Sequence, residues 1–338
     1  QVENDSPEGR LSLTELFQHT GRAHLIGITG APGTGKSSLV NQLALHYRKT
    51  VDKKVAIVAV DPSSPFTGGA VLGDRVRMRD LSGDEGIFIR SMASRGSLGG
   101  IAQKTASLAQ VFDAAGYEII IIETVGAGQS EVDIARLAHT TVVVEAPGLG
   151  DEIQAIKAGI LEIADVLVIN KADRPGVENT ERALRSTLEL AHPTKRVTPA
   201  LPLSFASGTT LALPARASVV AGGAGVRHHG KAMSIATSTI DSSIWIPPIN
   251  KTIATEGKGI AEVAESIARH AAHLRQSGDW EARDRSRLGS EMEMLLREAL
   301  MDRFLQSIQQ EKYEEMIEKV INRNISPYEA VKFLLNGK

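Results

Sequence analysis

A glycine-rich segment carries the most specific chemical pattern in the sequence. The run Gly30-Ala-Pro-Gly-Thr-Gly-Lys-Ser37 fits the spacing G-x-x-x-x-G-K-[ST]. Such glycines let backbone N–H groups curl around a β-phosphate, the following helix N-terminus adds partial positive charge, and Lys36 can reach the β- and γ-phosphates. The hydroxyl of Ser37 can complete a Mg²⁺ shell. We therefore expect a nucleoside triphosphate to bind at Gly30, Ala31, Pro32, Gly33, Thr34, Gly35, Lys36, Ser37 and Ser38.

A second motif indicates which base is bound. Asn170, Lys171 and Asp173 form N-K-x-D directly after an apolar run. A carboxylate there can accept from both the ring N–H and the exocyclic amine of guanine, whereas adenine offers no matching pair of donors. The wrong base would leave a charge unpaired, so such a site discriminates strongly. We predict a guanine site, and we expect a backbone N–H from Ile253, Ala254 or Thr255 to reach the guanine carbonyl.

Two acidic residues at the ends of expected strands suggest a magnesium site. Asp61 follows the apolar run 55–60, and Glu123 follows 119–122. Because the carboxyl ends of parallel strands share one edge of a sheet, both should face the phosphates. Mg²⁺ prefers oxygen ligands and keeps several waters, so one or both carboxylates would act through water. A helix cap or a salt bridge is the alternative explanation for Asp61 and Glu123. Asp74 is a further candidate carboxylate on the metal side.

Three loops combine glycine with charged residues and are candidate switch segments: 68–77, 95–100 and 147–157. Loops of this kind beside a nucleotide can be ordered by contacts to the γ-phosphate and Mg²⁺, although each could also be an ordinary solvated loop. Gly126, in the segment 126–130, could contact the γ-phosphate through its N–H. Lys157 could stabilise developing charge. The candidate catalytic residues are Lys36, Glu123, Gly126 and Lys157.

These motifs need a sheet to position them. Runs rich in Val and Ile alternate with amphipathic stretches, which is typical of a buried parallel sheet covered on both faces. We predict an α/β, doubly wound, mostly parallel fold, with every motif at a carboxyl end of a strand. The expected strands are 25–29, 55–60, 119–123, 141–145, 166–170 and 249–253, and the expected helices are 37–47, 101–115, 153–163, 179–190 and 260–274.

The chain divides into three expected regions. Residues 1–24 form a short N-terminal extension, 25–277 a P-loop domain, and 278–338 a helical C-terminal region. A low-complexity insertion, about 197–240, lies in a stretch without Asp or Glu. The C-terminal helices have apolar faces that need a partner, so they either pack on the sheet or form a dimerisation arm. The last helix should begin with a capping box at Ser326 and Glu329.

Composition limits the partners. The chain has 338 residues, 42% of them hydrophobic, and a net charge of -2, so no sequence-wide positive field exists to hold nucleic acid or an anionic membrane. No apolar run approaches the roughly 20 residues of a membrane helix. The lack of Cys excludes disulfides and thiolate zinc sites and fits a reducing compartment. We expect a cytoplasmic protein without nucleic-acid or membrane partners.

The motifs together resemble those of the MeaB/ArgK/MMAA family, notably in residues 60–64, 123–131, 148–154 and 170–173. The resemblance implies a GTPase that acts as a chaperone for an adenosylcobalamin-dependent acyl-CoA mutase, mainly methylmalonyl-CoA mutase, gating cofactor loading and protecting the mutase. It also implies a homodimer formed through C-terminal helices, and switches around Asp74, Gly126 and Gly150. The insertion and the nearly absent helical extension before the P-loop depart from the family pattern.

The expected reaction is in-line attack of water on the γ-phosphoryl group, with Lys36 and Mg²⁺ neutralising the developing charge. No residue matches a catalytic base or an arginine finger, so hydrolysis should be slow until the mutase supplies or orders a missing group. Three alternatives remain open. A nickel-delivery GTPase would have to rely on the pair His228-His229, an ATP-using kinase or transport ATPase conflicts with N-K-x-D, and a scaffold would bind nucleotide without turnover.

Overall fold

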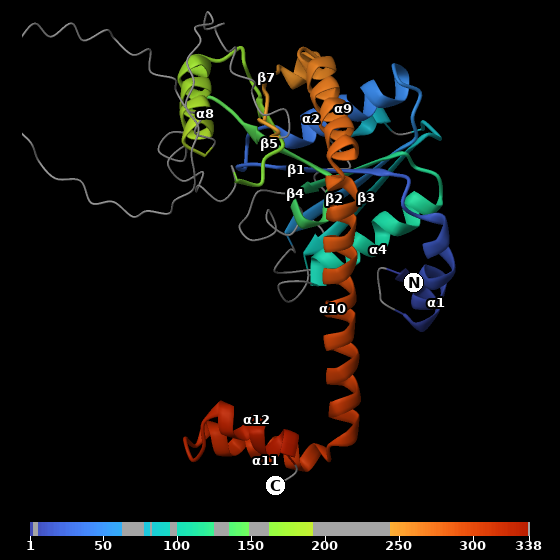
Figure 1. The fold of residues 1–338 in the computed structure, drawn as a ribbon, viewed down its shortest axis with the longest axis vertical. Helices are drawn as coiled ribbons and strands as arrows, with labels where there is room; N and C mark the ends of the chain where they lie inside the picture. Colours follow the sequence, from blue (N-terminus) through green and yellow to red (C-terminus); the bar gives the residue numbers. More distant parts are fainter. Residues whose placement is uncertain are drawn as a thin grey trace, which may run out of the picture.

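A parallel sheet between two layers of helices forms the body of the protein (Figure 1). The computed structural model describes residues 1–2, 6–62, 78–81, 83–94, 100–124, 135–148, 162–191 and 244–336. In these residues seven strands pair in the order β3-β2-β4-β1-β5-β6-β7, and every pairing is parallel. The strands are β1 (His24–Thr29), β2 (Val55–Pro62), β3 (Ile87–Ser94), β4 (Ile119–Thr124), β5 (Thr140–Glu145), β6 (Val166–Ile169) and β7 (Ile249–Lys251).

The helices of the described part vary widely in length. Three short 3₁₀ segments, η2 (Phe17–His19), η3 (Arg79–Leu81) and η4 (Ala254–Glu256), lie between longer elements. The α-helices are α1 (Pro7–Leu16), α2 (Lys36–Lys49), α4 (Gly100–Ala114), α8 (Val177–Ala191), α9 (Ile260–Ser277), α10 (Asp279–Ser307), α11 (Gln310–Ile321) and α12 (Pro327–Asn336).

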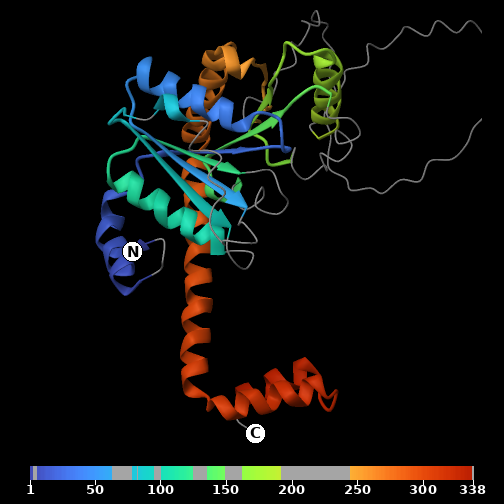
Figure 2. The same ribbon diagram turned by 180° about the vertical axis from the view of Figure 1, so that it is seen from behind.

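The central strands are apolar throughout because both of their faces are covered. All six residues of β4 are buried, and so are all six of β5. Successive side chains of a strand point to opposite faces, which divides the core in two. Ile121 packs in one cluster with residues of α2 and α9, whereas Ile120 packs in another with Phe112 of α4. Figure 2 shows α4 on the face opposite α2 and α9.

The predicted α/β fold is confirmed, and strand β3 and helix α1 were not predicted. Among the described strands, β3 lies at the edge of the sheet and pairs with β2. Its sequence mixes polar and apolar residues because part of it faces solvent: Phe88 is 44% exposed. Helix α1 lies within the region that we expected to be a short extension. Strand β7 is shorter than expected, and residues 153–161 of the expected helix 153–163 lie outside the described residues.

The C-terminal helices extend away from the sheet. Helix α10 is 29 residues long and projects from the body, with α11 and α12 at its far end (Figures 1 and 2). We call residues 279–336 the arm. The first half of α10 contacts the body, and α11 and α12 lie at its far end, so both interpretations of the C-terminal helices stay predictions. Large apolar side chains of the arm are exposed in the single chain, including Met292, Leu296, Leu300, Ile317 and Tyr328.

Two further expectations concern the ends of helices and their apolarity. The capping box forms as expected: the backbone N–H of Ser326 donates to Glu329 Oε2 over 2.9 Å, and that of Glu329 donates to Ser326 Oγ over 3.2 Å. Across the part of the chain that the structure describes, no helix combines the length and the apolarity needed to cross a membrane.

Candidate functional site

The glycine-rich loop lies between β1 and α2 and is built so tightly that two of its glycines are obligatory. Gly30 has a φ of +137°, and a Cβ there would lie 2.1 Å from the carbonyl oxygen of Val144 on β5. Gly35 has a φ of +92°, and a Cβ there would lie 2.4 Å from Asn170 Nδ2. Any side chain at these positions would strain the backbone and displace a neighbour. The loop is thereby pressed against β5 and against the residue that opens N-K-x-D.

Lys36 begins α2 and folds back over the loop that precedes it. Its Nζ donates to the carbonyl oxygens of Gly30, at 2.8 Å, and Ala31, at 3.0 Å, and the residue is only 6% exposed. The ammonium group therefore lies over the centre of the loop. An ammonium with three donors in this position suits a phosphate that enters the loop.

Ser37 and Glu123 meet as the magnesium hypothesis requires. Ser37 Oγ donates to Glu123 Oε1 over 2.6 Å, and Glu123, on β4, is 4% exposed. A hydroxyl and a carboxylate oxygen are ligands that Mg²⁺ accepts directly or through water, so these donors fit the ion. Asp61 lies within β2, two residues beyond Ala59, which pairs with Glu123. Only its backbone is described.

Asn170 joins the phosphate loop to the loop after β7. Its Nδ2 donates to the carbonyl oxygen of Thr34 over 2.9 Å. Its Oδ1 accepts from the hydroxyl of Thr252, at 3.1 Å, and from the N–H of Ala254, at 3.0 Å. Because the residue is 2% exposed and uses both ends of its amide in these bonds, it acts as a buried bridge between two loops.

Lys171 and Asp173 lie on the rim of the same site. Lys171 has a φ of +57°, unusual for a residue with a side chain, and its Nζ donates to the carbonyl oxygen of Gly33 over 2.5 Å. Asp173 is exposed at the turn that follows. Lys258 lies near Asp173. The hydrogen bond to Glu256 is the main cause of the raised pKa of the Lys258 ammonium, and the negative charge of Asp173 adds to it. The carboxylate of Asp173 is therefore open to a ligand and has a cation nearby.

Hydrogen bonds within the loop from Thr252 to Gly259 limit which backbone N–H could reach a guanine carbonyl. The N–H of Ile253 donates to the carbonyl oxygen of Lys258 over 3.1 Å, and that of Ala254 is held by Asn170. Two of the three N–H groups named from the sequence are thus already engaged. Gly259 ends this loop with a φ of +77°, and a Cβ there would lie 2.1 Å from the carbonyl oxygen of Lys251, so the loop can close only through glycine.

The structure brings together some of the predicted site residues and leaves others untested. Residues 30–38, Glu123, Asn170, Lys171, Asp173 and 253–255 lie at the carboxyl ends of β1, β4, β6 and β7. Asp74, Gly126, Gly150 and Lys157 lie outside the described residues, as do His228 and His229. Thr252 was missed, although a hydroxyl residue directly after a strand of the same sheet edge was the available signal.

Comparisons with known proteins agree with this geometry. The family model described as "Methylmalonyl Co-A mutase-associated GTPase MeaB" matches residues 1–309. A putative GTPase of Pyrococcus abyssi is 39% identical over 334 residues, which are 99% of this chain and 89% of that protein. The GTPase ArgK of Escherichia coli is 43% identical over 176 residues, 51% of this chain and 53% of that protein.

A solved structure resembles the whole chain. The crystal structure of an LAO/AO transport system kinase matches with a TM-score of 0.63 and 24% identity, covering 99% of this chain and 89% of that one. At that identity the likeness concerns the fold, and it agrees with the parallel sheet and helices described above. The family match over most of the chain adds the activity, and the chain belongs to the MeaB family of methylmalonyl-CoA mutase-associated GTPases.

Proposed function

We propose that the residues assembled at the sheet edge bind GTP together with Mg²⁺ and that this protein uses GTP hydrolysis to act as a chaperone for an adenosylcobalamin-dependent acyl-CoA mutase. The observation that supports the nucleotide site most directly is the bridge made by Asn170, which bonds to Thr34 in the phosphate loop and to Ala254 in the loop after β7. A bridge of this kind fixes the distance between a phosphate cradle and a base site. Residues 30–38 would hold the phosphates.

The base would be read by a side chain and a backbone group. Asp173, exposed beside Asn170, would accept from the ring N–H and the exocyclic amine of guanine. We assign the guanine carbonyl to the N–H of Thr255, because the N–H groups of Ile253 and Ala254 are engaged within the protein. Lys171 would lie along the base while its Nζ anchors the phosphate loop at Gly33.

Ser37 and Glu123 would hold the magnesium ion, with Asp61 as a further carboxylate on the neighbouring strand. When bound, Mg²⁺ supplies positive charge to the β- and γ-phosphate oxygens. Lys36 would exchange its carbonyl partners for phosphate oxygens and so add a second positive charge as the bond to the γ-phosphoryl group breaks. Water would attack in line with that bond. Gly126, Lys157 and Asp74 remain proposed participants.

Calorimetry with magnesium present tests the base assignment. GTP should bind at least about 100-fold more tightly than ATP, because adenine leaves the Asp173 carboxylate without its two donors. Asp173→Asn should weaken GTP binding by a similar factor. The same variant should bind xanthosine triphosphate, since an amide can pair with the ring N–H and the added carbonyl of xanthine. Equal binding of ATP and GTP would overturn the proposal.

The proposed partner is a mutase of the methylmalonyl-CoA type, as the description of the matching family suggests. We expect slow hydrolysis by the isolated protein and at least a tenfold faster rate when the mutase is added. Phosphate release, measured with Lys36→Ala as the inactive control, separates turnover from contamination. A rate that the mutase leaves unchanged would contradict the chaperone role, and a wild-type rate equal to that of the control would favour a scaffold.

The arm is the proposed dimer interface. Leu296, Leu300 and Met301 are each more than half exposed on α10 in the single chain, and burial of such side chains stabilises an interface. We expect the mass in light scattering to correspond to two chains. Leu296→Arg should give the mass of one chain, while Arg297→Ala, at an exposed neighbouring position, should not. A single-chain mass for the unaltered protein would count against this interface.

A further inference from the structure

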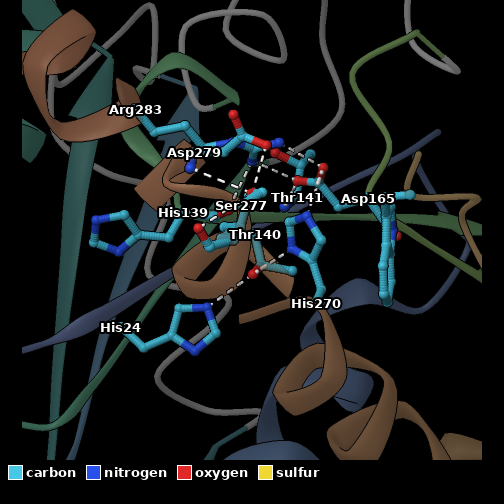
Figure 3. A network of polar contacts seen from close by, with 11 residues as sticks. His24, His139, Thr140, Thr141, Asp165, His270, Ser277, Asp279 and Arg283 are labelled. Carbon is cyan, nitrogen blue, oxygen red and sulfur yellow. Dashed lines mark hydrogen bonds and ion pairs between the residues drawn. The ribbon is translucent and has the colours of Figure 1, made fainter. Parts of the chain in front are cut away.

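The first turns of α10, which we call the arm root, are hydrogen-bonded to residues at the amino ends of β5 and β6. Arg283 of α10 donates through Nη1 to the carbonyl oxygen of His139, at 2.7 Å, and to Asp165 Oδ2, at 2.8 Å. Its Nη2 donates to Asp165 Oδ1 over 2.8 Å. Asp165 also accepts the backbone N–H of Thr141 over 2.8 Å, so β5, β6 and α10 meet at one carboxylate (Figure 3). A bidentate pair of this kind fixes direction as well as distance.

The same two strands end at the nucleotide motifs. Strand β6 has four residues, all buried, and it alone separates Asp165 from Asn170. At that end the N–H of Asn170 donates to the carbonyl oxygen of Glu145 on β5 over 2.7 Å. The carbonyl oxygen of Val144, also on β5, abuts Gly30 of the phosphate loop. The arm root and the phosphate loop therefore bear on opposite ends of one rigid pair of strands, which span about 16 Å from Asp165 to Asn170.

A second connection runs along α4. Gln110 Nε2 donates to both carboxylate oxygens of Glu291, at 2.8 and 3.0 Å, and Gln103 Nε2 donates to Glu298 Oε2 over 3.4 Å. The partners are seven residues apart on each helix and run in opposite directions, so these contacts form a polar seam between α4 and α10. The Gln103–Glu298 contact is exposed, so it can be exchanged for water at small net cost, whereas the Gln110–Glu291 contact is partly buried and holds the inner end of the seam.

The joint between arm and body is not fully packed. A cavity of about 210 Å³ lies there, lined from the body by Thr20, Asp113 and His139 and from the arm by Asp284, Arg287 and Leu288. Nε of Arg287 is buried and has no hydrogen-bond partner among the described residues. The free volume beside α10 gives the helix room to tilt at this joint.

We propose that α10 is a lever whose angle to the body depends on the bound guanine nucleotide, with the Asp165–Arg283 pair as its pivot. This inference rests on the proposed nucleotide site. The γ-phosphate distinguishes GTP from GDP and would engage Lys36, which now bonds to Gly30, the residue pressed against β5. The helix rises about 36 Å from Arg283 to Ser307, so a tilt of about 10° moves its end by about 6 Å.

The lack of Cys makes the lever measurable. In the double variant Glu85→Cys/Ser307→Cys, one spin label lies on the body and one at the end of α10, and the distance between them is measured. Mixing the labelled chain with an excess of unlabelled chain ensures that a dimer carries labels on one chain, so that the distance is measured within one molecule. We expect the mean distance to change by about 3 Å or more between GDP and a non-hydrolysable GTP analogue. Arg283→Lys keeps the charge but loses the bidentate pair, so it should reduce the change by at least about half. Arg285→Lys, at an exposed position on the same helix, is the matched control.

Thermodynamic linkage between the angle of α10 and nucleotide binding supplies a second measurement, the ratio of two nucleotide affinities. If the pivot couples the sites, Arg283→Lys must alter the ratio of affinities for the GTP analogue and GDP, by about threefold or more, whereas Arg285→Lys leaves the ratio unchanged. Should Arg283→Lys fail to fold, Gln103→Glu, which sets a like charge opposite exposed Glu298, should change the distance through the seam. Equal distances in both nucleotide states, or variants that retain the full change, overturn the lever alone. Failure of any guanine nucleotide to bind overturns the nucleotide site as well.

Discussion

The Nδ2 atom of Asn170 lies 2.9 Å from the carbonyl oxygen of Thr34, so one buried amide joins the base motif to the phosphate loop. The other end of that amide holds the loop after β7 through Thr252 and Ala254. Three segments far apart in the sequence are thus held by a single side chain. In the proposed site, the relative position of the two halves of the nucleotide would depend on Asn170.

Replacing Asn170 by alanine should separate these loops. The change removes four hydrogen bonds, two donated by Nδ2 to the carbonyl oxygens of Thr34 and Gly35 and two accepted by Oδ1. It leaves buried partners unsatisfied, at about 1–3 kcal/mol for each group that water does not reach. We expect affinity for both GTP and GDP to fall about 100-fold in calorimetry, with a lower melting temperature. Asn179→Ala, in the exposed first turn of α8, is the control. Unchanged affinity for both nucleotides would refute the bridging role.

Two glycines of the same loop should differ sharply in their response to alanine. Gly30→Ala combines a φ of +137° with a Cβ 2.1 Å from the Val144 carbonyl oxygen, whereas Gly33→Ala has a φ of +80° and open space around the new atom. The second change costs only the left-handed backbone, about 1 kcal/mol. The drop in melting temperature should therefore be several-fold larger for Gly30→Ala than for Gly33→Ala, and Gly30→Ala should abolish nucleotide binding. Equal effects of the two variants would contradict the close packing of the loop on β5.

The Ser37–Glu123 contact predicts how magnesium dependence responds to mutation. Glu123→Gln removes the negative charge 2.6 Å from Ser37 Oγ, so the magnesium concentration for half-maximal GTP hydrolysis should rise at least about tenfold. GDP binding in the presence of a chelator should change little. Glu118→Gln, at an exposed position just before β4, serves as the control. An unaltered magnesium requirement in Glu123→Gln would place the ion elsewhere.

The buried imidazoles at the arm root predict that mild acid destabilises the fold. Burial lowers the pKa of His24 well below its ordinary value of 6.5, and burial likewise lowers the pKa of His139. Both rings are disfavoured as cations in the folded state, so the unfolded chain binds more protons. The contribution of the two neutral rings to the free energy of unfolding is fully present above about pH 6.5. Below that pH it falls, by at most about 1.4 kcal/mol per pH unit for each group.

Melting temperatures between pH 7.5 and 5 test this expectation. His24→Gln can still donate to Thr140 but does not titrate, so its melting temperature should fall less than that of the unaltered protein; His19→Gln, at an exposed position, should behave like the unaltered protein. Asp284 does not contribute in this range. Burial acts to raise its pKa, but hydrogen bonds from His139 and Arg287 outweigh burial and lower the pKa to about 2, so its stabilisation is lost only below about pH 3.8.

Much of the fold and of the site could be predicted because each depends on local patterns. Apolar runs of Ile and Val predicted the central strands, and the two motifs expected to bind phosphate and base lie at the carboxyl ends of strands, as predicted. Strand β3 was missed because an edge strand is only partly buried, so Arg90 and Ser91 interrupt its apolar pattern. The pattern that predicts a central strand is absent there.

Contacts between distant segments could not be predicted in the same way. Nothing in the spacing of Thr34, Asn170 and Thr252 reveals that they meet, because their approach depends on the packing of three strands. The polar cluster at the arm root was missed for the same reason: His139, Asp165 and Arg283 are single polar residues that belong to no motif. An amphipathic helix pattern shows that α10 needs a partner, but it does not show that the helix leaves the sheet.

The two hydrogen bonds that Lys36 makes to Gly30 and Ala31 have a consequence for how ligand enters. These bonds satisfy two of the three donors of the ammonium within the protein. An incoming phosphate must displace those carbonyls before it gains the lysine. Exchange of one acceptor for another moderates the affinity and gives the protein a barrier to nucleotide loading that a partner could lower by moving a single side chain.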